Sequence, residues 1–287
     1  MDIEAISGAA TVALTSTILF LLVAKSWSAF SRTVGSTPNF AESIMHEAAQ
    51  RFRDELERIS SSQAIYLSGA LVFVVLFAAA YVLQAQTLFA GYPAWQLWLQ
   101  FGFLVLAALF AGWRLGSTVL AYRQVRFVRD ANVAVGHQLQ QISTGAKRVF
   151  HDVKTSAGVV DHVIVGQTGV YAVNVVARRG ARNGKAMLKN NHLSFSNSDE
   201  PVPVVEITSS ALRLEKEVSR LLGHKVRVRS VIAVPGWDIG EQTSEQHLLV
   251  NERTIPMLRG WRDQSDYLMN EDVETLQQEL TARCRRK

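Results

Sequence analysis

A stretch of 55 residues without one charged side chain, from Ile59 to Trp113, constrains this chain more than any other feature. A soluble domain does not need so long an uncharged segment, whereas each crossing of a bilayer needs about 20 apolar residues. Only 19% of the whole chain is charged, against about 25% in soluble domains. The sequence therefore predicts a membrane protein, and it excludes a purely soluble protein, a disordered chain and a collagen-like fibre.

Three segments are long enough to cross a bilayer. The first, Ala5–Ala24, is uncharged and follows acidic residues, which favours a retained helix over a cleaved signal peptide. Polar and turn-forming residues between Gln84 and Pro93 divide the long uncharged stretch into two further segments. None of the three contains a pair of ionisable residues, so we expect an anchor rather than a transporter. The expected spanning helices lie at about residues 5–25, 64–84 and 95–118.

The distribution of Lys and Arg between the loops predicts the orientation. Segment 25–63 holds five of them, segment 84–96 holds none, and Arg114 is the first of four arginines before residue 130. By the positive-inside rule, segment 25–63 and everything after the third helix are cytoplasmic, while the N-terminus lies outside. The expected location is the inner (plasma) membrane of a bacterial-type cell, crossed several times.

The cytoplasmic segment before the second span is predicted to hold an amphipathic helix at about residues 38–60. Thr37-Pro38 is a helix-start signal, and apolar residues follow it at helical spacing. Glu47 and Arg51 are four residues apart and are expected to pair on this helix. The helix either packs on the cytoplasmic domain or the membrane, or it joins copies into a homo-oligomer. Its apolar stripe keeps no strict heptad, which favours packing.

Residues 1–120 are therefore assigned to a membrane domain and residues 121–287 to a cytoplasmic domain. In the second domain, segments rich in β-branched residues alternate with helical ones, and Gln167-Thr168-Gly169 is a hairpin turn. This order is typical of an α/β domain with a mixed sheet flanked by helices. The expected strands are 149–154, 159–165, 170–177, 226–234 and 247–250, and a small hairpin is expected at 188–195. The expected helices are 118–143, Pro203–Leu222 and one near the C-terminus. Gly223 is expected to end the second of these helices, and Asn270 is expected to cap the third.

The cytoplasmic half is basic. Residues 114–287 carry 25 Lys and Arg against 18 Asp and Glu, whereas residues 1–113 carry five against seven. A basic domain suits an anionic partner such as DNA, RNA or the surface of the lipid bilayer, and the positive-inside rule produces the same bias. A single cysteine excludes a disulfide framework and a cysteine zinc cage, and the sequence has no glycine-rich phosphate loop or nucleophile elbow.

Three segments of the cytoplasmic half form a pattern: Gly136-His137, Val160-Asp161-His162-Val163-Ile164-Val165, and Gly169-Val170-Tyr171-Ala172-Val173-Asn174-Val175-Val176. They resemble the NERD (nuclease-related) domain, which is similar in its core to the PD-(D/E)xK nucleases. The resemblance covers about residues 130–240 and implies a restriction-endonuclease-like fold.

The resemblance also implies where a metal site belongs. In the family pattern an Asp and the Glu of a Glu-x-Lys strand hold a divalent metal, which polarises the phosphoryl group and activates water. Asp161 matches the Asp, but Asn174 stands where the Glu belongs and Val176 stands where the Lys belongs. His137 replaces a helix Glu, and Glu206 replaces a Gln. We therefore expect that the fold is kept and that the usual chemistry is lost, with no cofactor.

A relocated site is the alternative. Asp161, Glu206 and His137 are a metal-binding set that would hold Mg²⁺ or Mn²⁺ if the domain is active. Asp152 and Lys154 lie two residues apart on the first strand and point to one face. Each residue also has an ordinary interpretation: His137 as a solvated or packed side chain, Glu206 as a first-turn carboxylate, and the pair on the strand as an exposed edge. Lys185 or Lys189 would supply the missing ammonium group.

A basic segment follows the altered motif, from Arg178 to Lys185. Three interpretations stay open for it: phosphate contacts, a solvated turn, or contact with anionic lipid. Arg227 and Arg229 on the later strand are expected to extend its charge, and Trp237 is expected to pack rather than to stack on a base. The arginines and lysine assigned to anion binding are Arg178, Arg179, Arg182 and Lys185.

Three functions follow from these observations. The first is a membrane-anchored NERD-like module that binds nucleic acid or another anionic partner without efficient cleavage. The second is a metal-dependent nuclease with relocated catalytic residues. The third is a membrane scaffold that acts through protein or lipid contacts.

Overall fold

The computed structural model separates into two compact units, which are described in turn. The first comprises Met1–Thr37 with Glu55–Gln124, and the second comprises Pro38–Asp54 with Val125–Lys287. The segment Pro38–Asp54, predicted to belong to the membrane domain, is thus part of the second unit. The structure describes residues 3–34, 45–82, 94–143, 145, 147–180, 184–189, 191–196, 198–244, 246–259 and 266–284.

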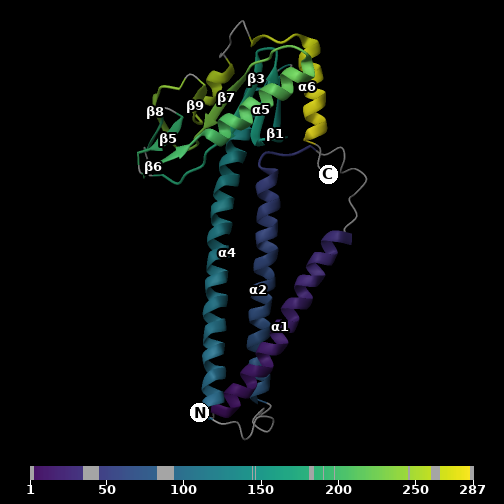
Figure 1. Cartoon of the computed structure of the whole chain (residues 1–287), viewed down its shortest axis with the longest axis vertical. Coiled ribbons are helices and arrows are strands. Elements are labelled where there is room, and N and C mark those ends of the chain that lie inside the picture. The colour runs from purple at the N-terminus through teal and green to yellow at the C-terminus, as the bar shows by residue number, and fades with distance from the viewer. Residues whose placement is uncertain are drawn as a thin grey trace. The chain divides into compact units, whose positions relative to one another are not determined.

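The first unit is built from long helices (Figure 1), α1 (Ile3–Val34) and most of α2 (Gln50–Val82) and α4 (Ala94–Ile142). Two segments, Gly8–Trp27 and Gln50–Ala80, are long and apolar enough to cross a membrane. Large apolar side chains along them are exposed, as lipid-facing residues are. Two helices are therefore long and apolar enough for the predicted spans; that they cross a membrane, and that α4 contains a third span, stay predictions.

The helix boundaries differ from those predicted. The amphipathic helix 38–60 is wrong, because residues 45–49 are not helical and Ala49 has a φ of 63°; residues 38–44 lie outside the described residues. Instead α2 begins at Gln50 and continues without a break past residue 60, where the predicted helix ended. Ser61 and Ser62 donate hydrogen bonds to the Arg58 carbonyl, 2.9 and 3.0 Å away, so these serines are satisfied inside the helix.

The second unit contains two sheets (Figure 1). The five-stranded sheet has the order β1-β2-β3-β7-β9; its first two pairs are antiparallel and its last two are parallel. The four-stranded sheet has the order β6-β5-β4-β8. The strands are β1 (Arg148–Thr155), β2 (Gly158–Gly166), β3 (Gly169–Val175), β4 (Lys185–Lys189), β5 (His192–Phe195), β6 (Ser198–Pro203), β7 (Val228–Ala233), β8 (Asp238–Gln242) and β9 (His247–Val250).

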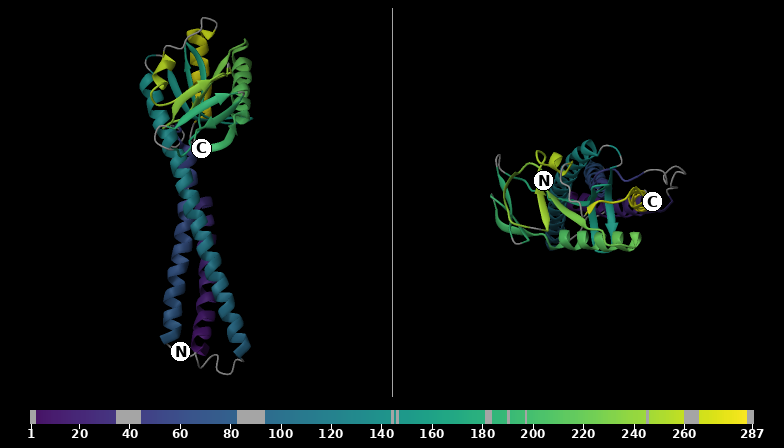
Figure 2. Two further views of the ribbon diagram at one scale, coloured as in Figure 1. Left: turned by 90° about the vertical axis from the view of Figure 1, so that its left-hand side faces the viewer. Right: turned by 90° about the horizontal axis from the view of Figure 1, so that it is seen from above.

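Helices cover both faces of the five-stranded sheet, as the mixed-sheet prediction required. One core joins the sheet to α5 (Val205–Leu222) and α6 (Asn270–Arg283), and a second joins it to the last turns of α4 and a short helix, η2 (Ile255–Arg259). A third core lies between the two sheets. Seen from above, α5 runs along one side of the strands (Figure 2). The domain is therefore a layered α/β unit.

The turns that contain glycine were predicted correctly, whereas strands without a clear alternation of apolar and polar residues were not predicted. Gly166 pairs with Gly169 across the two-residue hairpin, and Gly223 ends α5 in the left-handed conformation with a φ of 74°. Strands β6 and β8 were missed, because neither alternates apolar and polar residues. Asn270 is the first helical residue and not the cap; its side chain accepts a hydrogen bond from Gln167.

Candidate functional site

Asp161 lies where β2 and β3 stop pairing. The last paired residues are His162 and Val173, and beyond them the Val175 N–H donates to Asp161 Oδ2, 2.7 Å away, instead of to the neighbouring strand. The other oxygen, Oδ1, accepts a hydrogen bond from the Arg51 guanidinium. Both carboxylate oxygens of this buried residue are therefore occupied by groups of the protein itself.

Asp152 lies on the neighbouring strand β1 and faces the same arginine. Its Oδ2 accepts the Arg51 main-chain N–H at 3.2 Å, and its Oδ1 lies 3.5 Å from Arg51 Nε. Asp152 thus caps the first turn of α2 from outside the helix. The prediction of an exposed strand edge is wrong for Asp152, which is buried, although Lys154 is exposed.

The backbone at Asp152 explains how it turns inward. Its φ is 51°, in the left-handed region that Asp tolerates better than most residues. The strand's alternation is interrupted there, so that Phe150 and Val153, three residues apart, lie in the same core. The Asp152 carboxylate is thereby freed from the regular strand pattern to face α2.

Burial dominates the electrostatics of the two carboxyls. Burial raises the pKa of Asp161 to about 6, against the opposing effect of the Arg51 charge. Burial also raises the pKa of Asp152, against its hydrogen bond and charge interaction with Arg51. The Arg51 guanidinium is therefore the cation that stabilises the ionised forms of both carboxyls.

A pair of buried histidines lies beside the aspartates. His151 and His162 approach with their Nδ1 atoms 2.8 Å apart, and Gln140 Nε2 lies 3.0 Å from His151 Nε2. Because an amide nitrogen only donates, His151 accepts at Nε2 and donates from Nδ1 to His162. Burial lowers the pKa of His151 to about 4 and that of His162 to about 3, so both rings are neutral at pH 7.

Gly136 makes room for this pair. A Cβ at Gly136 would lie 3.2 Å from His162 Cε1 and 2.7 Å from the Ala48 side chain. The glycine of the Gly-His segment therefore serves the close approach of α4 to β2 and to the segment before α2. The His151–His162 contact was not predicted, because only one of its two members lies in the family motif.

Two of the predicted metal ligands are not brought to Asp161. His137 is exposed and its Nε2 lies 3.0 Å from Gln141 Nε2 on the same helix. Glu206 is an exposed carboxylate in the first turn of α5, where it favours the helix dipole. Among the described residues, no three His, Cys, Asp or Glu side chains could together hold a metal ion. The structure therefore does not bring Asp161, Glu206 and His137 together among the residues it describes.

The two altered motif positions carry no charged group. Asn174 is buried, and its Nδ2 has no hydrogen-bond partner among the residues that the structure describes. Val176 packs against the core between the two sheets. Neither position supplies a carboxylate or an ammonium group next to Asp161.

The basic segment after β3 is held by Trp237. Trp237 is buried, and its Nε1 donates to the Arg178 carbonyl at 2.9 Å. A Cβ at Gly180 would lie 2.2 Å from the indole ring, so the main chain of Gly180 packs against the ring with no room for a side chain. The Arg178 guanidinium lies over the Phe195 ring, 5.2 Å from its centroid. The predicted packing role of Trp237 is confirmed.

The other basic residues have different surroundings. The Arg179 guanidinium lies 5.3 Å from the centroid of the Phe127 ring on α4, and Lys185 is exposed at the start of β4. Arg227 is exposed, but Arg229 is buried and ion-paired with Asp266. The prediction that Arg229 extends a surface patch is therefore wrong. Arg182 lies outside the described residues.

Residues 129–235 match the family model of the nuclease-related domain, NERD. The match runs from the last turns of α4 to the end of β7 and includes both aspartates, whereas Arg51 lies outside it. No curated protein and no solved structure matches the chain. The restriction-endonuclease-like fold implied by the resemblance stays an expectation.

The residues at this site do not fit the divalent cation that the NERD resemblance implies. A metal would need free carboxylate oxygens, yet those of Asp161 are bonded to Arg51 and to Val175. The neutral Asn174 and the apolar Val176 add no charge.

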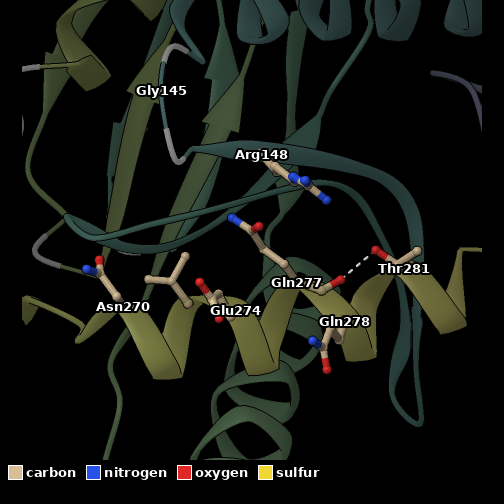
Figure 3. Close-up of a pocket in the computed structure, with 8 residues that line it drawn as sticks. Gly145, Arg148, Asn270, Glu274, Gln277, Gln278 and Thr281 are labelled. Atoms are coloured by element: carbon tan, nitrogen blue, oxygen red, sulfur yellow. Dashed lines mark hydrogen bonds between the residues drawn. The ribbon is translucent and has the colours of Figure 1, made fainter.

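A polar cavity of about 610 Å³ lies apart from the aspartates, between α6 and the start of β1 (Figure 3). Arg148 and Gln277 project into it in this view, and Thr281 donates a hydrogen bond to the Gln277 carbonyl. The lining contains three amide side chains, one positively charged side chain and one negatively charged side chain. It contains none of the predicted site residues: Gly145, Arg148, Asn270, Val273, Glu274, Gln277, Gln278 and Thr281.

Proposed function

We propose that this protein is a membrane-anchored NERD module that binds an anionic partner, nucleic acid in the first place, and does not cleave it. The observation that carries the proposal is the Arg51 guanidinium on the two carboxylates, at the position where a nuclease would hold its metal. Asn174 and Val176 support it, because loss of a principal catalytic group commonly costs several powers of ten in rate.

Membrane attachment is supported by the two apolar helical segments. The proposal places the NERD domain in the cytoplasm, because Lys and Arg are concentrated in segment 25–63 and after residue 114. The inner membrane of a bacterial-type cell and an outward N-terminus belong to the same proposal.

Cleavage is the direct test. The full-length protein in detergent is incubated with single- and double-stranded DNA and with RNA, in the presence of Mg²⁺ or Mn²⁺. We expect no cleavage above that of a buffer control, and no change in Asp161→Ala. Cleavage that is lost in Asp161→Ala would overturn the proposal. It would favour the relocated nuclease, for which the buried Asp152 beside the same arginine is the supporting observation.

Binding is tested by its dependence on salt. We expect the affinity for a labelled DNA duplex to fall with rising salt, because Lys and Arg release counterions from phosphates. Arg179→Ala combined with Lys185→Ala should reduce the slope of log affinity against log salt by about 2, near 0.9 for each lost contact. Arg213→Ala is the control, an exposed arginine on α5 that is not assigned to anion binding. An unchanged slope in the double variant would remove this segment from the interface.

Indifference to nucleic acid at every salt concentration, together with a stable oligomer in detergent, would instead favour the membrane scaffold. Homo-oligomer formation and lipid contacts by the basic segment stay predictions.

A further inference from the structure

We infer that Arg51 is a built-in cation that takes the place of an exchangeable divalent metal in the NERD domain. The inference deepens the proposed function, since it explains how the two buried aspartates persist in a domain without metal chemistry. It concerns a residue outside the segment that matches the family.

The contacts of Arg51 are those of a bridging cation. Its guanidinium binds Asp161 and lies 3.5 Å from Asp152, and its main-chain N–H donates to Asp152. The arginine side chain is 37% exposed while each carboxylate side chain is 5% exposed. The guanidinium therefore covers the two carboxylates from the solvent side and closes the access that a metal would use.

The helix itself does not account for an arginine at this position. A cation in the first turn of a helix is disfavoured by the helix dipole, so Arg51 would be unfavourable in α2 without nearby anions. Asp152 and Asp161 supply those anions from strands about a hundred residues later in the chain. The arginine is thus explained by the buried carboxylates and not by the propensities of α2.

The segment before α2 fixes Arg51 in place. The His46 N–H donates to the Cys284 carbonyl at 2.8 Å, at the end of α6. Ala48 packs against Gly136 on α4, and Ala49 makes the left-handed turn into α2. The neighbouring arginine, Arg53, instead pairs with Glu47, and both of these side chains are exposed. Of these two arginines, only Arg51 is directed into the domain.

The test measures thermal unfolding of the full-length protein in detergent, with and without about 1 mM Mn²⁺ as the probe. Arg51→Ala should lower the melting temperature by about 5 °C or more, because it leaves buried carboxylates without a counter-ion. Mn²⁺ should raise the melting temperature of Arg51→Ala by several degrees and leave the wild type unchanged. The gain should disappear in Arg51→Ala combined with Asp161→Asn. Arg53→Ala is the matched control and should behave as the wild type in both conditions.

The outcomes separate this inference from the proposed function. If Arg51→Ala does not fold alone, recovery of a cooperative transition with Mn²⁺ supports the inference. No effect of Mn²⁺ on Arg51→Ala, folded or not, overturns it and leaves the absence of cleavage standing. Equal stabilisation of the wild type by Mn²⁺ also overturns it, because the wild-type site would then accept a metal. Cleavage by the wild type, in contrast, contradicts the proposed function directly.

Discussion

Trp237→Ala is expected to lower the free energy of unfolding of the second unit by about 3–5 kcal/mol, the range for removing a buried aromatic side chain. The indole is 2% exposed and lies 4.7 Å from the Phe195 ring, centroid to centroid. Gly180 rests directly on it, so the cavity would open beneath the basic segment. We therefore expect weaker DNA binding as well as lower stability.

Trp237→Phe separates packing from hydrogen bonding. It keeps most of the apolar contact but leaves the Arg178 carbonyl without its donor, a loss of about 1–2 kcal/mol. Denaturant unfolding followed by far-UV circular dichroism measures both variants. A loss below about 1 kcal/mol for Trp237→Ala would show that the segment does not depend on this contact.

Acidification from about pH 7 to pH 4.5 is expected to cost the same unit about 3 kcal/mol. His151 and His162 have folded-state pKa values of about 4 and about 3, below the ordinary 6.5. Their contribution is complete above pH 6.5 and is lost as the pH falls toward the folded-state values, because only the unfolded chain binds the protons. Asp161 acts in the opposite direction: because its folded-state pKa is raised to about 6, the folded state takes up this proton first, and the resulting stabilisation grows as the pH falls from about 6 toward the ordinary value of 3.8. The two histidines outweigh Asp161, and the raised pKa of Asp152 acts in the same direction as that of Asp161.

The melting temperature at the two pH values checks this prediction. His162→Gln should lower stability at neutral pH and make the pH dependence shallower, because one buried titrating group is gone. The exposed His137→Gln is the control and should keep the wild-type dependence. A wild type equally stable at both pH values would mean that the two rings are already charged, or are solvated, in the folded protein.

The sequence predicted what local chemistry determines. The hairpin at Gln167-Thr168 and the end of α5 at Gly223 follow from turn geometry, and both are confirmed. Asp161 was identified through the family motif, and the structure places it at the opening between two strands. These features depend on a few adjacent residues, which is why a single sequence sufficed.

The centre of the site could not be predicted in the same way. Arg51 was expected to pair with Glu47 on one helix, but Glu47 lies before the start of α2 at Gln50 and pairs with Arg53 instead. The contact between Arg51 and Asp161 joins residues 110 positions apart, for which local periodicity carries no signal. Asp152 was predicted to lie at an exposed strand edge, because the neighbouring residues give no sign of the left-handed backbone that turns its side chain inward.

The length of α2 has a structural consequence. Its 33 residues measure about 50 Å, which is about 20 Å more than a perpendicular crossing of a hydrocarbon layer about 30 Å thick requires. Arg51, Arg53 and Arg58 all lie near its start, before the uncharged stretch that begins at Ile59. A single helix therefore contains both the apolar residues of a predicted span and, in its first turn, the guanidinium that neutralises the aspartates.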